Sequence, residues 1–155
     1  MKTVFIVDDN DTNLFVTKNA LDGHYRALSL PSAEKLFDMI KKVRPDLILL
    51  DIDMPVMDGM TALTILKSDK EFADIPVIFL TAYASDSLEA EGLEAGAMDF
   101  ITKPFSQPVL LNRIAHNLKT AEVVGVLEEI TEKLLAGDFQ TAATLANEYK
   151  KSCVK

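Results

Sequence analysis

The chain has 155 residues, with 24 acidic and 16 basic side chains and a formal net charge of −8 at pH 7. This length suits one domain with a small extension, and 48% hydrophobic with 26% charged residues is typical of a globular protein rather than a disordered one. The acidic balance argues against direct binding to nucleic acid, which requires a basic surface for the phosphate backbone.

The beginning of the chain and its single cysteine indicate the cellular compartment in which the protein works. Met1 is followed at once by a predicted strand, and no apolar stretch approaches the roughly 20 residues that span a membrane. Cys153 has no partner for an intramolecular disulfide, which fits a reducing environment. We therefore expect a soluble cytoplasmic protein without membrane contact.

Five short segments have the pattern of β-strands. Unbroken apolar runs at residues 4–7, 47–50 and 77–80 are typical of strands covered on both faces of a sheet. Segments 25–30 and 98–102 interleave polar residues, which suits the edges of the sheet. Placing the apolar strands in the centre favours the strand order 2-1-3-4-5.

Segments of helical period separate these strands. The predicted helices cover residues 12–21, 33–40, 59–66, 85–95 and the segment from the Ser106 cap and Pro108 through Leu118. The helix at 85–95 is poor in apolar side chains. Strands that alternate with helices imply an α/β fold, a doubly wound, five-stranded parallel sheet with right-handed crossovers, of the flavodoxin-like class.

Charged and polar residues follow the predicted strands where ligands bind in such sheets. Asp8 and Asp9 follow the first strand, Asp51 the third, Thr81 the fourth and Lys103 the fifth. Two carboxylates about 4 Å apart repel by about 4 kcal/mol at an effective dielectric constant of 20, so the cluster requires a counter-charge. Mg²⁺ prefers such oxygen ligands, and a carboxylate can also accept a phosphoryl group. A metal, a lysine and a hydroxyl supply the charge neutralisation for that transfer.

Four motifs occur in register with this sheet. They are VDDN at residues 7–10, DIDMPVMDG at 51–59, LTAYA at 80–84 and ITKPF at 101–105. Over roughly residues 2–119 the sequence thus resembles the response-regulator receiver domains of two-component signalling, the CheY-like family. One such motif is a common accident, but four in order and at matching spacing are specific.

The resemblance implies a role for each site residue. Asp51 would accept a phosphoryl group from a sensor histidine kinase or a phosphotransfer protein. Asp9 would bind Mg²⁺ directly and Asp8 through water, with Asp51 and the backbone carbonyl of Asp53 completing the metal site. Lys103 would pair with the phosphoryl oxygens.

The resemblance also implies a switch. Thr81 would bind the phosphoryl group, its inward movement would free room for the rotating aromatic Phe100, and the Lys103-Pro104 bond would be cis. The face formed by the fourth helix, the fifth strand and the fifth helix would then change for a partner or output domain. Such a domain is not a turnover enzyme, because it catalyses only its own phosphorylation and dephosphorylation.

One enzymatic alternative stays open. Asp51 and Asp53 also resemble the DxD pair of haloacid-dehalogenase-type phosphohydrolases, which use an aspartyl-phosphate and Mg²⁺. Met54 and Pro55 do not fit the motif of that family. In this sequence the Asp51 and Asp53 pair also follows the third predicted strand, whereas the motif of that family lies near the start of the chain. Sustained turnover of a phosphomonoester would discriminate between the two functions.

Residues 1–120 are predicted to form the receiver domain and residues 121–155 a C-terminal helical hairpin. Gly137 is the predicted helix stop and Asp138 the next cap. The preceding helix either ends at Leu118 or runs into the tail through Thr120. Two apolar seams are predicted to pack together: Val123, Leu127, Ile130 and Leu134, and Phe139, Ala142, Ala146, Tyr149 and Cys153. The hairpin packs on the receiver or on itself, forms a homodimer, or begins an output region that is cut at Lys155.

Overall fold

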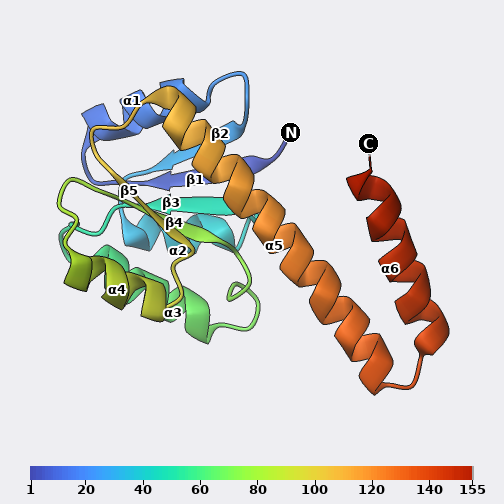
Figure 1. Cartoon of the computed structure of the whole chain (residues 1–155). Coiled ribbons are helices and arrows are strands. Elements are labelled where there is room, and N and C mark those ends of the chain that lie inside the picture. The colour runs from blue at the N-terminus through green and yellow to red at the C-terminus, as the bar shows by residue number, and fades with distance from the viewer. Residues whose placement is uncertain (155) are drawn as a thin grey trace. The chain divides into compact units, whose positions relative to one another are not determined.

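The structure is a computed structural model that describes residues 1–154. The chain divides into two compact units, Met1–Leu118 and the residues from Lys119 onward. The first unit holds all five strands and the helices that cover them (Figure 1).

The sheet of the first unit is parallel and has the strand order β2-β1-β3-β4-β5 (Figure 1). The strands are β1 Thr3–Val7, β2 Arg26–Leu30, β3 Leu47–Leu50, β4 Val77–Thr81 and β5 Asp99–Thr102. The helices are α1 Asp11–Leu21, α2 Ala33–Ile40, α3 Gly59–Ser68, α4 Asp86–Glu94 and α5 Gln107–Leu135. The predicted doubly wound flavodoxin-like fold and its strand order are confirmed.

Each central strand buries both of its faces, which explains the unbroken apolar runs. Phe5 and Val7 of β1 belong to the core beneath α2, α3 and α4. Val4 and Ile6, whose side chains alternate with them, belong to the core beneath α1 and the first part of α5. The two cores fix the sheet, so that the loops after the strands project from one edge.

Helix α5 is longer than the predicted helix that ends at Leu118. It runs without interruption from Gln107 to Leu135, so the alternative in which it continues through Thr120 is correct. No proline follows Pro108 within this helix, and the lone Gly125 is tolerated in a helix interior. Among the described residues, no helix combines the length and the apolar content needed to cross a membrane.

The second unit contains the end of α5 and helix α6, Phe139–Cys153, which run antiparallel (Figure 1). Gly137 has a φ of 78° at the turn, and the Asp138 side chain accepts a hydrogen bond from the Thr141 amide at 3.1 Å. The predicted stop and cap are therefore confirmed.

The side chains between the two helices agree with the predicted seams only in part. Leu127, Leu134 and Phe139 are 57%, 46% and 68% exposed, and Ala146 and Cys153 are also exposed. Val123, Ile130 and Tyr149 of the predicted seams are partly buried around the buried Ala142, as predicted. Two apolar side chains outside the predicted seams, Val126 and Leu145, are partly buried with them. Residues 123, 126 and 130 share a helix face as readily as residues 123, 127 and 130, so the spacing alone does not choose between them.

Candidate functional site

Three carboxylates meet at the carboxyl ends of β1 and β3. One oxygen each from Asp8, Asp9 and Asp51 lies within 4.8 Å of the others. Strands β1 and β3 are neighbours, with Val7 opposite Leu50, and the Asp51 amide donates a hydrogen bond to the Val7 carbonyl at 2.9 Å. Asp8 and Asp51 are buried and Asp9 is exposed, so the cluster opens to solvent on one side.

The side chain of Lys103 joins this cluster from the end of β5. Its Nζ donates a hydrogen bond to Asp8 Oδ2 at 2.6 Å and lies 3.6 Å from Asp51 Oδ1. The Lys103 amide donates to the Thr81 carbonyl at 2.8 Å, and the Lys103-Pro104 bond is cis, as the resemblance implied. One ammonium offsets only part of the charge of three carboxylates.

The pKa of Asp51 reflects its burial first and the surrounding charges second. Burial raises the pKa of the Asp51 carboxyl to about 6, against the lowering effect of Lys103 and with a further increase from Asp8. The buried carboxyl of Asp51 therefore takes up a proton at higher pH than an ordinary aspartate does. Clustered carboxylate oxygens that need a further cation fit Mg²⁺, a hard ion that takes oxygen ligands.

Two asparagines outside the predicted set of site residues contact the Asp8 carboxylate. The Asn10 amide donates to Asp8 Oδ1 at 2.9 Å, and Asn13 Nδ2 approaches the same oxygen at 3.5 Å. The Asn10 side chain caps α1 by accepting a hydrogen bond from the Asn13 amide. An Asn followed three residues later by another polar residue at a helix start is the sequence signal for this arrangement.

The loop after β3 brings α3 directly against the site. A Cβ atom at Gly59 would lie 2.2 Å from the Asp51 carbonyl oxygen, and the Gly59 amide donates to the Ile52 carbonyl at 2.8 Å. Asp53 is exposed, and its carboxylate is not part of the cluster of Asp8, Asp9 and Asp51. The metal role of the Asp53 carbonyl remains a prediction.

Thr81 is fully buried at the end of β4, beside the cluster, and its hydroxyl is bonded to the following loop. Thr81 Oγ1 donates to the Tyr83 carbonyl at 3.1 Å and accepts from the Tyr83 amide at 3.2 Å. The Tyr83 side chain itself is 76% exposed. The hydroxyl therefore holds the loop between β4 and α4 in a turn.

Phe100 lies on β5 with its ring inside the first unit. The residue is 8% exposed, and its ring centroid is 5.1 Å from that of Phe79, with the rings inclined at 54°. Tilted pairs at this separation are favourable aromatic contacts. The ring is thus buried while the Thr81 hydroxyl is still bonded to Tyr83.

The chain matches the response regulator receiver domain family over residues 4–115. It is 38% identical over 119 residues to the transcriptional regulatory protein YvrH of Bacillus subtilis, covering 76% of this chain and 49% of YvrH. It is 33% identical over 121 residues to the polar-differentiation response regulator DivK of Brucella ovis, covering 77% of this chain and 98% of DivK. The chain therefore spans about half the length of YvrH but nearly all of DivK.

The fold comparison agrees with the sequence comparisons. The chemotaxis protein CheY4 of Vibrio cholerae superimposes with a TM-score of 0.72 at 26% identity, over 76% of this chain and 98% of that one. The family match covers the four motifs and the whole acidic cluster. This protein belongs to the response regulator receiver domain family, the phosphoacceptor domains of two-component signalling.

Proposed function

We propose that this chain is a switch that accepts a phosphoryl group on Asp51 from a histidine kinase or a phosphotransfer protein. The observation that carries the proposal is the buried Asp51 carboxylate, which lies 3.6 Å from Lys103 and within 4.8 Å of Asp8 and Asp9. A carboxylate in this position is a nucleophile with its charge neutralisation arranged around it.

Each group has a separate task in the proposed transfer. An Asp51 oxygen attacks the phosphorus while the donor's nitrogen or oxygen leaves, and Lys103 pairs with the phosphoryl oxygens. The Thr81 hydroxyl gives up its bond to Tyr83 and donates to the phosphoryl group. Mg²⁺ would be held by Asp8, Asp9, Asp51 and the Asp53 carbonyl, with Asp9 as the proposed direct ligand, and it would supply positive charge beside the phosphoryl oxygens.

The family is a signalling family rather than one of classical enzymes, which leaves no support for the phosphohydrolase alternative. We expect the chain to catalyse only its own phosphorylation and dephosphorylation, without sustained turnover of a phosphomonoester. Its partners in this proposal are proteins of a cytoplasmic signalling pathway, not nucleic acid or membrane. The exposed, unpaired Cys153 is consistent with a reducing compartment.

The test is phosphorylation by acetyl phosphate in the presence of Mg²⁺, followed by mass spectrometry of the intact chain. We expect one added phosphoryl group, its loss in Asp51→Asn, and its retention in the matched control Asp53→Asn, whose carboxylate is exposed. Asp9→Ala should weaken Mg²⁺ binding more than Asp8→Ala. Modification that persists in Asp51→Asn, or that is equally fast after chelation of Mg²⁺, would contradict the proposal.

The proposed output surface is formed by α4, β5 and the first part of α5. Release of Tyr83 by the Thr81 hydroxyl would loosen the loop that leads into α4, a helix with little apolar surface to bury. Amide exchange in residues 82–105 should therefore change on phosphorylation. Identical exchange in the two states would remove this part of the proposal.

We further propose that residues 1–120 form the receiver and that residues 121–155 form an extension through which the chain makes a homodimer. Val124, Leu127 and Leu134 are about half exposed on the second unit. A hollow of about 480 Å³ there is lined by Val124, Leu127, Glu128, Thr131 and Glu132. Because the same unit carries Lys150 and Lys151 on α6, a second copy offers both apolar surface and charges opposite to the two glutamates.

Light scattering of the full chain at high concentration tests this extension. Leu127→Glu combined with Leu134→Glu should lower the mass to that of a monomer, whereas Val16→Glu, an exposed apolar residue on α1, should not. A chain that ends at Thr120 should also be monomeric. A monomeric wild type, with and without phosphorylation, would leave only intramolecular packing or an output region beyond Lys155.

A further inference from the structure

Gly92 of α4 lies directly against the ring of Phe100. A Cβ atom at this position would be 2.6 Å from both Cε2 and Cζ of Phe100, and 3.2 Å from Cε2 of Phe79. Carbon atoms pack at about 3.5 to 4.0 Å, so the ring occupies space that any side chain at position 92 would take.

The helix backbone does not itself require glycine here. Gly92 lies within the last turn of α4, three residues before the C-cap Ala95, and is not among the glycines with positive φ. Glycine is one of the least favourable residues in a helix, so its presence in this short helix weakens the helix. The structural feature that depends on glycine at position 92 is the burial of the Phe100 ring.

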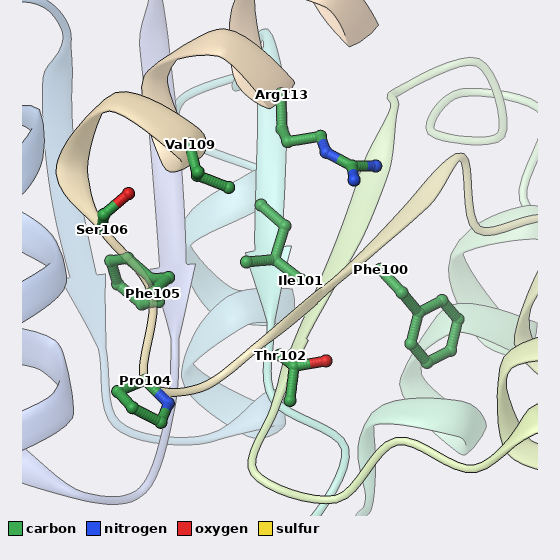
Figure 2. A pocket seen from close by; sticks show the side chains of 8 residues that line it. All are labelled: Phe100, Ile101, Thr102, Pro104, Phe105, Ser106, Val109 and Arg113. Carbon is green, nitrogen blue, oxygen red and sulfur yellow. The ribbon is translucent and has the colours of Figure 1, made fainter.

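Phe100 also borders a second space, on the open side of its strand. Strand β5 is an edge strand of the sheet, and a hollow of about 260 Å³ beside it is lined by residues that include Phe100, Phe105, Val109 and Arg113. Figure 2 shows the Phe100 ring extending away from Phe105 and Arg113. A ring that left its site against Gly92 would therefore move to the edge that carries this hollow.

We propose that Gly92 is the positioning residue of Phe100, and that its missing side chain keeps the ring buried before any phosphoryl transfer. Burial of the ring then does not depend on Thr81, whose hydroxyl is still bonded to Tyr83 in the same structure. The regulatory meaning rests on the proposed function. Phosphorylation in this chain acts through the loop at Tyr83, while the ring is already in place.

The experiment follows the ring itself by ¹⁹F NMR of the full chain grown with 4-fluorophenylalanine. The chain has 8 phenylalanines, and Phe100→Leu assigns the signal of Phe100 by its absence. The difference in chemical shift between H₂O and D₂O reports the exposure of the ring. Gly125→Ala is the matched control, because it is the same change within a helix and a Cβ atom there meets nothing within 4 Å.

For the unphosphorylated protein we expect a buried Phe100 signal in the wild type and in Gly125→Ala, and an exposed signal in Gly92→Ala. Gly125→Ala should raise the urea midpoint of unfolding, whereas Gly92→Ala should lower it. In the Phe100→Leu background, where the ring is gone, Gly92→Ala should no longer lower the midpoint. A Gly92→Ala chain that keeps a buried Phe100 signal, or that loses as much stability without the ring as with it, would overturn the proposal.

Addition of acetyl phosphate and Mg²⁺ then separates this inference from the proposed function. The wild-type Phe100 signal should stay in its buried position on phosphorylation, and the exposed signal of Gly92→Ala should be present before it. A wild-type ring that becomes buried only on phosphorylation would overturn the inference while supporting the phosphoacceptor function. Failure of the chain to become phosphorylated would overturn the function but leave the comparison of unphosphorylated variants intact.

Discussion

Replacement of Asp51 by asparagine should stabilise the metal-free protein. The folded chain raises the pKa of the Asp51 carboxyl from 3.8 to about 6, chiefly because the group is buried. Each unit of pKa corresponds to about 1.36 kcal/mol, so ionised Asp51 costs the folded state about 3 kcal/mol. Asparagine keeps the shape of the side chain and carries no charge, which removes this cost.

The gain should depend on pH in a defined direction. The folded carboxyl binds its proton more tightly than the carboxyl of the unfolded chain does. The stability that comes from this tighter proton binding is fully present below pH 4 and is lost as the pH rises through about 6. Asp51→Asn should therefore gain about 3 kcal/mol at pH 8, about half of that at pH 5, and almost nothing below pH 4.

Urea unfolding of both chains in EDTA at pH 5 and pH 8 measures the effect. Asp53→Asn is the matched control, because its carboxylate is exposed and its removal should change the free energy of unfolding little. Mg²⁺ should stabilise the wild type more than Asp51→Asn, since a ligand stabilises the state that binds it. An Asp51→Asn chain that is no more stable than the wild type at pH 8, or whose gain is the same at both pH values, would refute the electrostatic reasoning.

Two further substitutions test the backbone around the site. Gly59→Ala should destabilise the fold by about 3 kcal/mol, because its Cβ would overlap the Asp51 carbonyl oxygen, while Gly125→Ala should stabilise it by up to about 1 kcal/mol; urea midpoints measure both. Val56→Gly should stabilise the fold by about 1 kcal/mol, because Val56 has a φ of 69°, a strained conformation for a β-branched residue. The exposed Val16→Gly in α1 should have the opposite sign, and equal losses for the two would contradict the assignment of strain.

The arrangement of the site was predictable because it follows from the sheet. The site residues all lie at or just beyond the carboxyl end of a strand, and a parallel sheet brings these strand ends to one edge; they are Asp8, Asp9, Asp51, Thr81 and Lys103. Hydrophobic periodicity fixes which segments are strands, and the purely apolar runs fix which strands are central. The order of the strands then places all of these side chains at the same edge of the sheet.

Features that depend on distances between elements were not predictable. The approach of Gly92 to Phe100 depends on how closely α4 lies over β5, and no pattern within either segment encodes that separation. The continuation of α5 beyond Leu118 has a similar cause, since the sequence there suits both a single helix and two. In the second unit, the choice of Val126 over Leu127 as an inward residue depends on the rotation of one helix against the other.

In the proposed switch, Thr81 is the residue through which the acidic cluster acts on the rest of the first unit. Its carbonyl accepts the Lys103 amide and its hydroxyl donates to Tyr83, so it contacts both the cluster and the loop. In the proposed transfer, the Thr81 hydroxyl exchanges the neutral Tyr83 carbonyl for a charged phosphoryl oxygen, which would gain about 1 kcal/mol, the difference between typical neutral and charge-assisted hydrogen bonds. That gain shifts a two-state equilibrium only about fivefold, whereas conversion from 1% to 99% requires about 5.5 kcal/mol.

The new hydrogen bond of the Thr81 hydroxyl therefore shifts the equilibrium of the loop between β4 and α4 but is too weak to convert the loop fully to its second state. Most of the remaining free energy has to come from interactions that differ between the two states. The nearest such interaction in the proposed switch is the pair of Lys103 with the phosphoryl group, because Lys103 binds Asp8 at 2.6 Å in this structure. A partner that binds only the changed loop adds to the same difference. If the Phe100 ring is already seated against Gly92, none of this free energy is spent on moving it, and a smaller total shift suffices for the switch.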